Sequence, residues 1–331
     1  MARATASGCL FGLAYGDALG KPTEFRTVAE IQHRYGPAGP RELDGYPALV
    51  TDDTQMTLAV GWALRDAGRP EPESLATLLR QRFLAWAASP DNNRAPGNTC
   101  LRACAELSRG VPWQEASVPG SKGCGANMRV APAGLVAGYD LDTLAGVAQL
   151  QAGLTHGHPT ALAASELTAY AVRVLRDGAD LTAVPGLLRE RCHRQHAVYR
   201  ADWLGPLWQR PGVEDPAEFI ARGWDECLAV LDRLDAALAR PDDGTDVCLL
   251  TGEGWIAEEA LATALLCALR HADEPVSALA RAACTSGDSD SIACLTGAFV
   301  GAAHGMAAWP AGWADRIEYA DQLADLGRHW D

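Results

Sequence analysis

The stretch LVTDDTQMTLAVGWAL, residues 49–64, places two adjacent aspartates directly before an apolar run. Asp52 and Asp53 lie between threonines, and residues 54–65 are apolar on nearly every helical face, which is typical of a helix buried on most sides. One acidic or hydroxyl side chain is enough to cap the free amides at a helix start. The second aspartate therefore needs a further explanation.

A second acidic segment, SGDSDSIACLTGAFVGAAHG at residues 286–305, repeats this arrangement near the other end of the chain. Asp288 and Asp290 alternate with serines, and residues 292–303 are again apolar nearly all round. Four carboxylates near buried helix ends would repel one another without cations. Carboxylate and hydroxyl oxygens select Mg²⁺, Mn²⁺ or Ca²⁺ over zinc. If the two segments meet, they form a binuclear metal site; if their helices lie apart, each segment is solvated.

The composition favours helices over sheets. The 331 residues are rich in Ala, Leu and Gly, and runs of β-branched residues are scarce, so we expect an all-α protein. Amphipathic periodicity predicts a helix from Pro159 to about Gly178 and another over 256–268. Neither a low-complexity linker nor a fixed-period repeat is visible, and one bundle-like domain over residues 1–331 is the simplest organisation.

Charge and cysteine content restrict the class of protein further. A net charge of -14 gives no general footprint for nucleic acid or an anionic membrane, although a local basic patch remains open. The first 20 residues are too short and polar for a signal peptide or membrane span, because Asp17 interrupts their apolar run. We expect a cytoplasmic protein whose ten cysteines are free, buried thiols, without a zinc site at Cys192.

A glycine-rich segment, GSKGCGANMRVAPAGL at residues 120–135, and the motif LTHGHP at 154–159 are candidates for ligand contacts. Glycines let several backbone amides approach an anion, so the first segment is either a phosphate cradle or a tight turn. It matches neither nucleotide-binding fingerprint. His156 either contacts a ligand or has a structural role. Residues 199–217 are predicted as a surface loop whose Trp203 and Trp208 either anchor it in the core or form a binding surface.

Seven motifs, taken in order, resemble the ADP-ribosylglycohydrolase family, also called the dinitrogenase-reductase-activating glycohydrolase or ADP-ribosyl-acceptor hydrolase family. They cover nearly the whole chain: GCLFGLAYGDALGKPTEF (8–25), TDDTQMTL (51–58), RAPGNTC (94–100), SKGCGANMRVAPAGL (121–135), LTHGHP (154–159), GEGWIAEEALATAL (252–265) and SGDSDSIACLTGAFVGAAHG (286–305). The resemblance implies a single compact, orthogonal multi-helix bundle with two Mg²⁺ ions, or Mn²⁺ as a substitute, in a central cleft.

The resemblance also implies roles for residues at matching positions. It implies metal ligation by Thr51, Asp52, Asp53, Asp288, Asp290 and Ser291. Glu24, on a loop over the metals, would reach a metal, its water or the substrate, and we group it with Asp53 and Asp290 as catalytic. Substrate contacts are implied for Ser121, Gly123, Gly125, Asn127, Met128 and His156.

The function implied is hydrolysis of the bond between ADP-ribose and an acceptor, with arginine or serine of a protein favoured over a nucleic acid. Members acting on ADP-ribosyl-arginine commonly have an aspartate at the position of Ala95, and Asp91 lies nearby in the sequence. Two alternatives stay open: a two-metal phosphoesterase, and a catalytically silent protein that binds ADP-ribose or a partner. We expect a monomer without membrane contacts.

Overall fold

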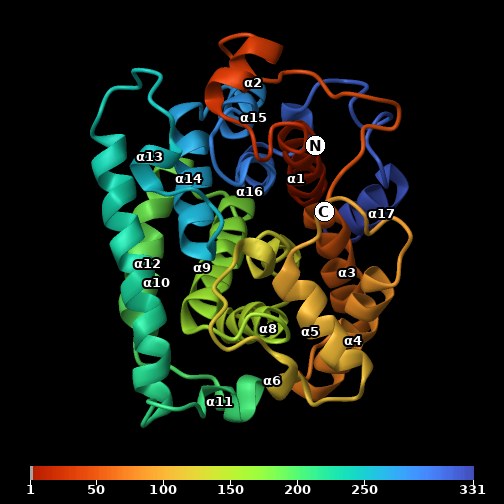
Figure 1. Cartoon of the computed structure of the whole chain (residues 1–331). Coiled ribbons are helices and arrows are strands. Elements are labelled where there is room, and N and C mark those ends of the chain that lie inside the picture. Colours follow the sequence, from red (N-terminus) through yellow and green to blue (C-terminus); the bar gives the residue numbers. More distant parts are fainter. Residues whose placement is uncertain (1–2) are drawn as a thin grey trace.

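Helices make up the regular structure of residues 3–331, the part of the chain that the computed structural model describes (Figure 1). Within this part there are seventeen α-helices: α1 (Thr5–Gly20), α2 (Val28–Tyr35), α3 (Asp52–Ala67), α4 (Pro72–Ala87), α5 (Asn98–Ser108), α6 (Trp113–Ala116), α7 (Ala131–Leu135), α8 (Leu141–Gly153), α9 (Pro159–Arg176), α10 (Val184–Gln195), α11 (Ala201–Leu204), α12 (Pro216–Leu238), α13 (Cys248–Thr251), α14 (Ala257–Arg270), α15 (Pro275–Ala283), α16 (Ser289–His304) and α17 (Ala320–Trp330). Four short 3-10 turns, η1 (Cys124–Ala126), η2 (Leu181–Ala183), η3 (Gly205–Trp208) and η4 (Met306–Ala308), join them. The predicted all-α class is confirmed.

The two apolar helices begin earlier than their apolar runs, so that Asp52, Asp53 and Asp290 belong to first turns, while Asp288 is the N-cap of α16. Thr51 is the N-cap of α3 and accepts a hydrogen bond from the Asp53 amide. Asp290 lies in the first turn of α16. A carboxylate is favoured there because the free amides and the helix dipole give this end a partial positive charge.

Helices α1 and α16 pack against each other with almost no space between their backbones. Glycines recur at every fourth residue of α1, at positions 8, 12, 16 and 20, and therefore lie on one face. A Cβ atom added to Gly16 would lie 1.9 Å from the Ala293 carbonyl oxygen, and one added to Gly20 would lie 2.3 Å from the Asp290 Cα atom. Residues later in α1 contact residues earlier in α16, so the two helices are antiparallel.

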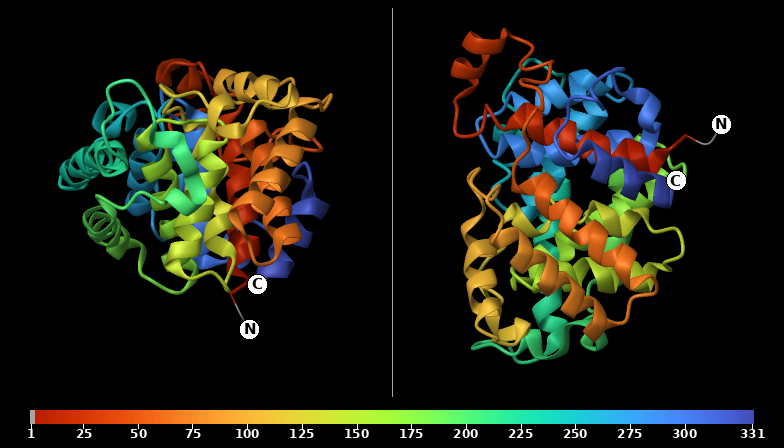
Figure 2. Two further views of the ribbon diagram at one scale, coloured as in Figure 1. Left: turned by 90° about the horizontal axis from the view of Figure 1, so that it is seen from below. Right: turned by 90° about the vertical axis from the view of Figure 1, so that its right-hand side faces the viewer.

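This antiparallel pair sets the position of the surrounding helices. Figure 1 shows α1 and α16 in the upper part of the molecule, α3, α4 and α5 on one side, and α9 and α12 on the other. The buried apolar side chains form one continuous cluster from Ala6 to Trp330. The start of α1 lies near the C-terminal end of α17 in Figures 1 and 2, and the Asp331 side-chain carboxylate accepts the amides of Ala6 and Ser7.

Residues 201–208 are helical, so the surface loop predicted over 199–217 is wrong for this part. The indole of Trp203 packs directly on Gly146 of α8, where an added Cβ atom would lie 2.2 Å from the ring. Trp203 and Trp208 are both half-buried against the core. The tryptophans therefore anchor the segment, and this packing holds it in the helical turns of α11 and η3.

The remaining expectations concern thiols and membranes. All ten cysteines are free and buried, as predicted. Around Cys192, the described residues form no group of metal-ligating side chains. No helix within residues 3–331 combines the length and the apolar character that crossing a membrane requires.

The close helix contact yields a stability prediction. Gly16→Ala forces a methyl group into the backbone of α16 and should lower the free energy of unfolding by about 2–4 kcal/mol, measured by urea denaturation. Gly186→Ala in α10 is the matched control, because an added Cβ there has no atom within 4 Å. The control should leave stability unchanged or raise it by up to ~1 kcal/mol. Equal effects of the two substitutions would contradict the proposed packing constraint.

Candidate metal centre

The two acidic segments and Glu24 meet at one pocket. Glu24 follows α1, and the antiparallel packing brings the end of this helix to the start of α16. Carboxylate oxygens of Glu24, Asp288 and Asp290 all lie within 4.8 Å of one another. Asp52 and Asp53, from the start of α3, line the same pocket. We call Glu24, Asp52, Asp53, Asp288 and Asp290 the acidic cluster.

The pocket has a volume of about 300 Å³ and is formed by segments distant in the sequence. Besides the acidic cluster, its lining includes Ser291, Met128 and His156, the glycine-rich segment at Gly123, Cys124 and Gly125, the segment 95–100, and the aromatic residues Phe25 and Trp255. The rings of Phe25 and Trp255 stack at a centroid distance of 5.6 Å, and both are partly exposed. The pocket therefore joins carboxylates, a glycine-rich segment of backbone and an aromatic surface.

The carboxylates of the cluster raise one another's pKa values. Burial, followed by the charges of Asp290, Asp52 and Asp17, raises the pKa of Glu24 to about 9. Burial is also the main reason that the pKa of Asp52 rises to about 7, although the amide of Gly97 opposes this by donating to the carboxylate. Burial raises the pKa values of Asp53 and Asp288 well above their usual range, and neighbouring carboxylates add to it.

A divalent cation fits this arrangement. None of the five carboxylates forms an ion pair with a lysine, arginine or histidine of the described chain. The buried Oδ1 atom of Asp53 has no hydrogen-bond partner among the described residues. Buried charges of one sign without partners are costly, and hard oxygen ligands are the donors that Mg²⁺ and Mn²⁺ prefer.

Asp17 is a residue of this site that sequence reasoning missed. It is fully buried in α1, and its carboxylate accepts hydrogen bonds from the amide and hydroxyl of both Thr51 and Thr54, at 2.5–3.0 Å. Burial and the charge of Asp290 raise its pKa to about 7, while the threonine hydrogen bonds oppose this rise. Asp17 therefore holds the start of α3 in place behind the pocket. An aspartate inside an otherwise apolar run was the available signal.

Three of the predicted site residues lie beside the pocket rather than on its lining. The Thr51 hydroxyl lies 2.8 Å from Asp17 Oδ1 and 3.2 Å from Asp53 Oδ2. Ser121 Oγ lies 2.9 Å from Thr99 Oγ1. Asn127 is fully buried, and its side-chain amide donates to the Ala257 carbonyl.

The lysine of the glycine-rich segment points away from the acidic cluster. Lys122 pairs with Glu226 of α12 at 2.7 Å and with Glu258 of α14. Two carboxylates therefore neutralise its ammonium group and tie the segment to both helices. The glycine-rich segment lines the pocket at Gly123, Cys124 and Gly125 without a lysine charge. The Cys124 amide donates to the Trp255 carbonyl at 3.0 Å.

The segment 94–97 forms the edge of the pocket next to α3. Arg94 holds it by pairing with Glu318 and by donating to the Val50 carbonyl at 2.6 Å. Ala95 is exposed on the pocket lining and has a positive φ of 50°. Asp91 does not line the pocket; its carboxylate accepts the Tyr319 hydroxyl at 3.0 Å.

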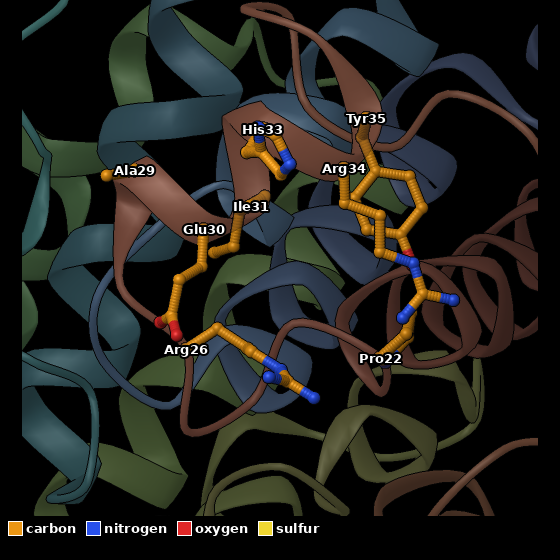
Figure 3. A pocket seen from close by; sticks show the side chains of 8 residues that line it. All are labelled: Pro22, Arg26, Ala29, Glu30, Ile31, His33, Arg34 and Tyr35. Atoms are coloured by element: carbon orange, nitrogen blue, oxygen red, sulfur yellow. The ribbon is translucent and has the colours of Figure 1, made fainter.

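A second pocket, of about 440 Å³, lies against α2 and the residues that follow Glu24 (Figure 3). Its charged lining consists of Arg26, His33 and Arg34 with Glu30, whose carboxylate is occupied by the amide and hydroxyl of Thr27. In Figure 3 the guanidinium groups of Arg26 and Arg34 extend toward the side of the pocket where Pro22 lies. This is a local basic patch. Among the residues that the structure describes, no group of metal-ligating side chains lies on its lining.

Comparisons with known proteins assign a family to this all-α fold with its acid-lined pocket. The family described as ADP-ribosylglycohydrolase matches residues 2–330. The chain belongs to the ADP-ribosylglycohydrolase family, and the resemblance found in its motifs is confirmed.

Two curated relatives and one solved structure illustrate the similarity. An ADP-ribosylarginine hydrolase Tri1 of Serratia proteamaculans is 26% identical, over 97% of this chain and 77% of that protein. An ADP-ribosyl-[dinitrogen reductase] glycohydrolase of Rhodospirillum rubrum is 36% identical, over 48% of this chain and 53% of that protein. This match therefore spans about half of each protein.

The structural similarity covers nearly the whole chain. A structure titled "ADP-ribosylglycohydrolase-related protein complex" superposes with a TM-score of 0.66 at 23% identity, covering 98% of this chain and 96% of the other. At this identity the likeness concerns the fold.

The raised pKa values predict how the stability of the metal-free protein changes with pH. Folded Asp17 and Asp52, with pKa values of about 7, bind protons more tightly than unfolded aspartates near pH ~4. Their contribution is present at low pH and is lost as the pH rises from about 4 to 7. With a chelator present, the melting temperature should fall by roughly 5 °C between pH 5 and pH 7.5.

Added Mg²⁺ should reverse this loss at pH 7.5 and have less effect at pH 5. The depressed pKa values of His156 and His158 act in the opposite direction, because these residues favour the folded state as the pH rises. Asp53→Asn isolates the acidic contribution, and its metal-free melting temperature should depend less on pH. Melting curves that are insensitive to both pH and Mg²⁺ would refute the metal centre.

Proposed function

We propose that this protein is a Mg²⁺-dependent hydrolase that cleaves the glycosidic bond between ADP-ribose and an acceptor, releasing free ADP-ribose. The observation that carries this proposal is that one pocket joins a group of unpaired carboxylates to a glycine-rich segment with His156. The carboxylates suit a pair of hard cations, and the glycine-rich segment with His156 suits a diphosphate. Family membership and the names of the relatives support the reaction type.

The proposed metal ligands come from both ends of the chain. Asp52 and Asp53 with Thr51, and Asp288 and Asp290 with Ser291, would hold two Mg²⁺ ions, with Mn²⁺ as an alternative. When bound, such ions stabilise developing negative charge and lower the pKa of coordinated water. Asp17 would keep Thr51 and the start of α3 at the right position during turnover.

Glu24 is the proposed proton acceptor. Its carboxylate lies at the edge of the cluster, next to Asp288 and Asp290, on the loop that follows α1. It must be ionised to take a proton from water, and the neutralisation of its neighbours by cations lowers its pKa from about 9. As water adds to the anomeric carbon, the bond to the acceptor breaks and the acceptor leaves with the electron pair. Glu24 receives the water proton and passes it to the departing acceptor, which is released in its protonated form.

The opposite wall of the pocket would hold the ADP-ribose diphosphate. The backbone at Gly123 and Gly125, together with the ring of His156, would provide hydrogen-bond donors there without adding a lysine charge. Met128 would pack against the ligand from the pocket floor. Ser121 and Asn127 would act by holding the segment, since each is engaged with another residue.

The acceptor is an ADP-ribosylated protein side chain in this proposal, with arginine and serine as the candidates. A relative named as an ADP-ribosylarginine hydrolase favours arginine. Ala95 supplies no carboxylate for a guanidinium, and Asp91 is held by Tyr319 outside the pocket. Both observations weigh against an arginine acceptor. A nucleic-acid acceptor is less favoured at a net charge of -14. The monomeric state and a cytoplasmic location stay predictions.

The product distinguishes this reaction from its alternatives. The Mg²⁺-loaded protein should release intact ADP-ribose from arginine-linked or serine-linked ADP-ribosylated protein, detected by liquid chromatography. AMP as the product would instead identify a two-metal phosphoesterase. Binding of ADP-ribose without any release would identify a silent binding protein.

Asp53→Asn and Asp290→Asn should each lower the hydrolysis rate at least ~100-fold and weaken Mg²⁺ binding, measured by calorimetry. Each substitution removes a charged ligand while keeping the shape of the side chain. Asp273→Asn, at an exposed position outside the pocket lining, is the control and should leave both quantities unchanged. Full activity of either site variant would contradict the assignment of that aspartate as a metal ligand.

A further inference from the structure

The His156 ring lies between the pocket and a chain of buried polar groups. Its Nδ1 atom is 2.8 Å from Thr155 Oγ1, and the ring is almost fully buried. Its other nitrogen, Nε2, makes no hydrogen bond with the described residues. A Cβ atom added to Gly123 would lie 3.3 Å from Nε2, and one added to Gly125 would lie 3.2 Å from Cε1. The Nε2 edge of the ring therefore lies against the glycine-rich segment on the pocket lining.

Arg129 lies behind this ring as a buried cation without a carboxylate partner in the described structure. Its guanidinium donates to Oε1 and to the backbone oxygen of Gln151, and it lies 4.3 Å from the centre of the Phe83 ring. It also donates to Thr155 Oγ1 at 2.8 Å. Because a guanidinium has donors only, this contact has one direction, and Thr155 must accept.

The single hydroxyl proton of Thr155 then has one good acceptor. The Ala152 carbonyl is 3.4 Å from Oγ1 and already accepts the amides of Thr155 and His156 at 3.1 and 2.8 Å. Nδ1 of His156 is closer, at 2.8 Å, and is otherwise free. The hydroxyl therefore donates to Nδ1. A neutral imidazole carries one proton, so that proton is on Nε2.

We propose that Arg129 and Thr155 are positioning residues that hold His156 in its Nε2-protonated, neutral form, so that the ring donates a hydrogen bond into the pocket. The recipient is an anionic oxygen, and its identification as the ADP-ribose diphosphate rests on the proposed function. Without these contacts the neutral His156 ring would be a mixture of two tautomers. The tautomer protonated on Nδ1 presents the lone pair of Nε2 to the anion. An anion is repelled by a lone pair, so the wrong tautomer weakens binding.

The charges around the ring favour the neutral form. Burial and the Arg129 charge lower the pKa of His156 well below its usual range. The thiols of Cys124 in η1 and Cys100 in α5 are neutral, because burial raises the pKa of each. The carboxylates of the acidic cluster, from the loop after α1 and the starts of α3 and α16, lie elsewhere on the pocket lining.

Nitrogen-15 NMR of histidine-labelled protein tests the tautomer without a ligand. At pH 7 the His156 signals should show a protonated Nε2 and an unprotonated Nδ1 that accepts a hydrogen bond. Thr155→Val removes the donor and should produce a mixed or Nδ1-protonated signal, whereas Thr155→Ser should retain the wild-type signature. Thr168→Val is the matched control, because the buried Thr168 hydroxyl has no partner among the described residues. It should leave the His156 signals unchanged.

Calorimetry with ADP-ribose and the Mg²⁺-loaded protein measures the consequence. Thr155→Val should weaken ADP-ribose binding about 10-fold, while Thr155→Ser and Thr168→Val should bind like the wild type. A wild-type spectrum with Nδ1 protonated, or a charged ring at pH 7, overturns the inference even if Thr155→Val does not fold. Wild-type affinity in a folded Thr155→Val protein overturns it as well. The expected tautomer without any ADP-ribose binding supports the positioning roles and instead removes the proposed function.

Discussion

The backbone contact between α1 and α16 is the constraint on which the site depends. Two helices can approach this closely only where no side chain stands between their backbones, and the glycines on one face of α1 meet this need. Because the helices are antiparallel, the end of α1 reaches the start of α16. Thr23 and Ser289 complete this junction, with their hydroxyl oxygens 2.9 Å apart. Glu24 is thereby brought to Asp288 and Asp290, although more than 250 residues of sequence separate them.

The buried carboxylates of the acidic cluster destabilise the folded protein, and other contacts must offset this cost. Burial raises the pKa values of all five carboxylates, and the opposing hydrogen bonds come from a few groups, such as the Gly97 amide at Asp52. Sites of this kind lower stability and persist where they have a function. Asp17 and its two threonines resist the repulsion by holding the start of α3 from behind.

The glycine-rich side of the pocket differs from the acidic cluster, because its charged residues contact other parts of the protein instead of lining the pocket. Lys122 is bound by two glutamates, and Arg129 is covered by Gln151, Thr155 and the Phe83 ring. What reaches the pocket on this side is uncharged: the backbone at Gly123 and Gly125 and the His156 ring. Neutral donors suit an anionic ligand that must also leave, since a fixed opposite charge would hold the product more tightly.

Residue types and their periodicity were sufficient to predict the all-α class, the buried helices after TDDT and SGDSDS, and the free buried cysteines. The acidic pairs, Gly123, Gly125 and His156 line one pocket, and their roles there stay predictions. Each of these follows from local properties, such as helical spacing, excess charge at a helix start, or backbone freedom at glycine. The number of metal ions, the acceptor and the single-domain organisation stay predictions.

Only the tertiary structure decided which helices are in contact. These contacts in turn determine the roles of Asp17, Lys122, Arg129 and Trp203. In the sequence, Asp17 was evidence against a membrane span, and Lys122 was one more polar residue of a glycine-rich segment. Their partners are 34 to 136 residues away, at Thr51, Glu226 and Glu258. Local sequence determines where a helix forms, but the burial of charge depends on contacts between distant backbones, and these arise only when the chain packs.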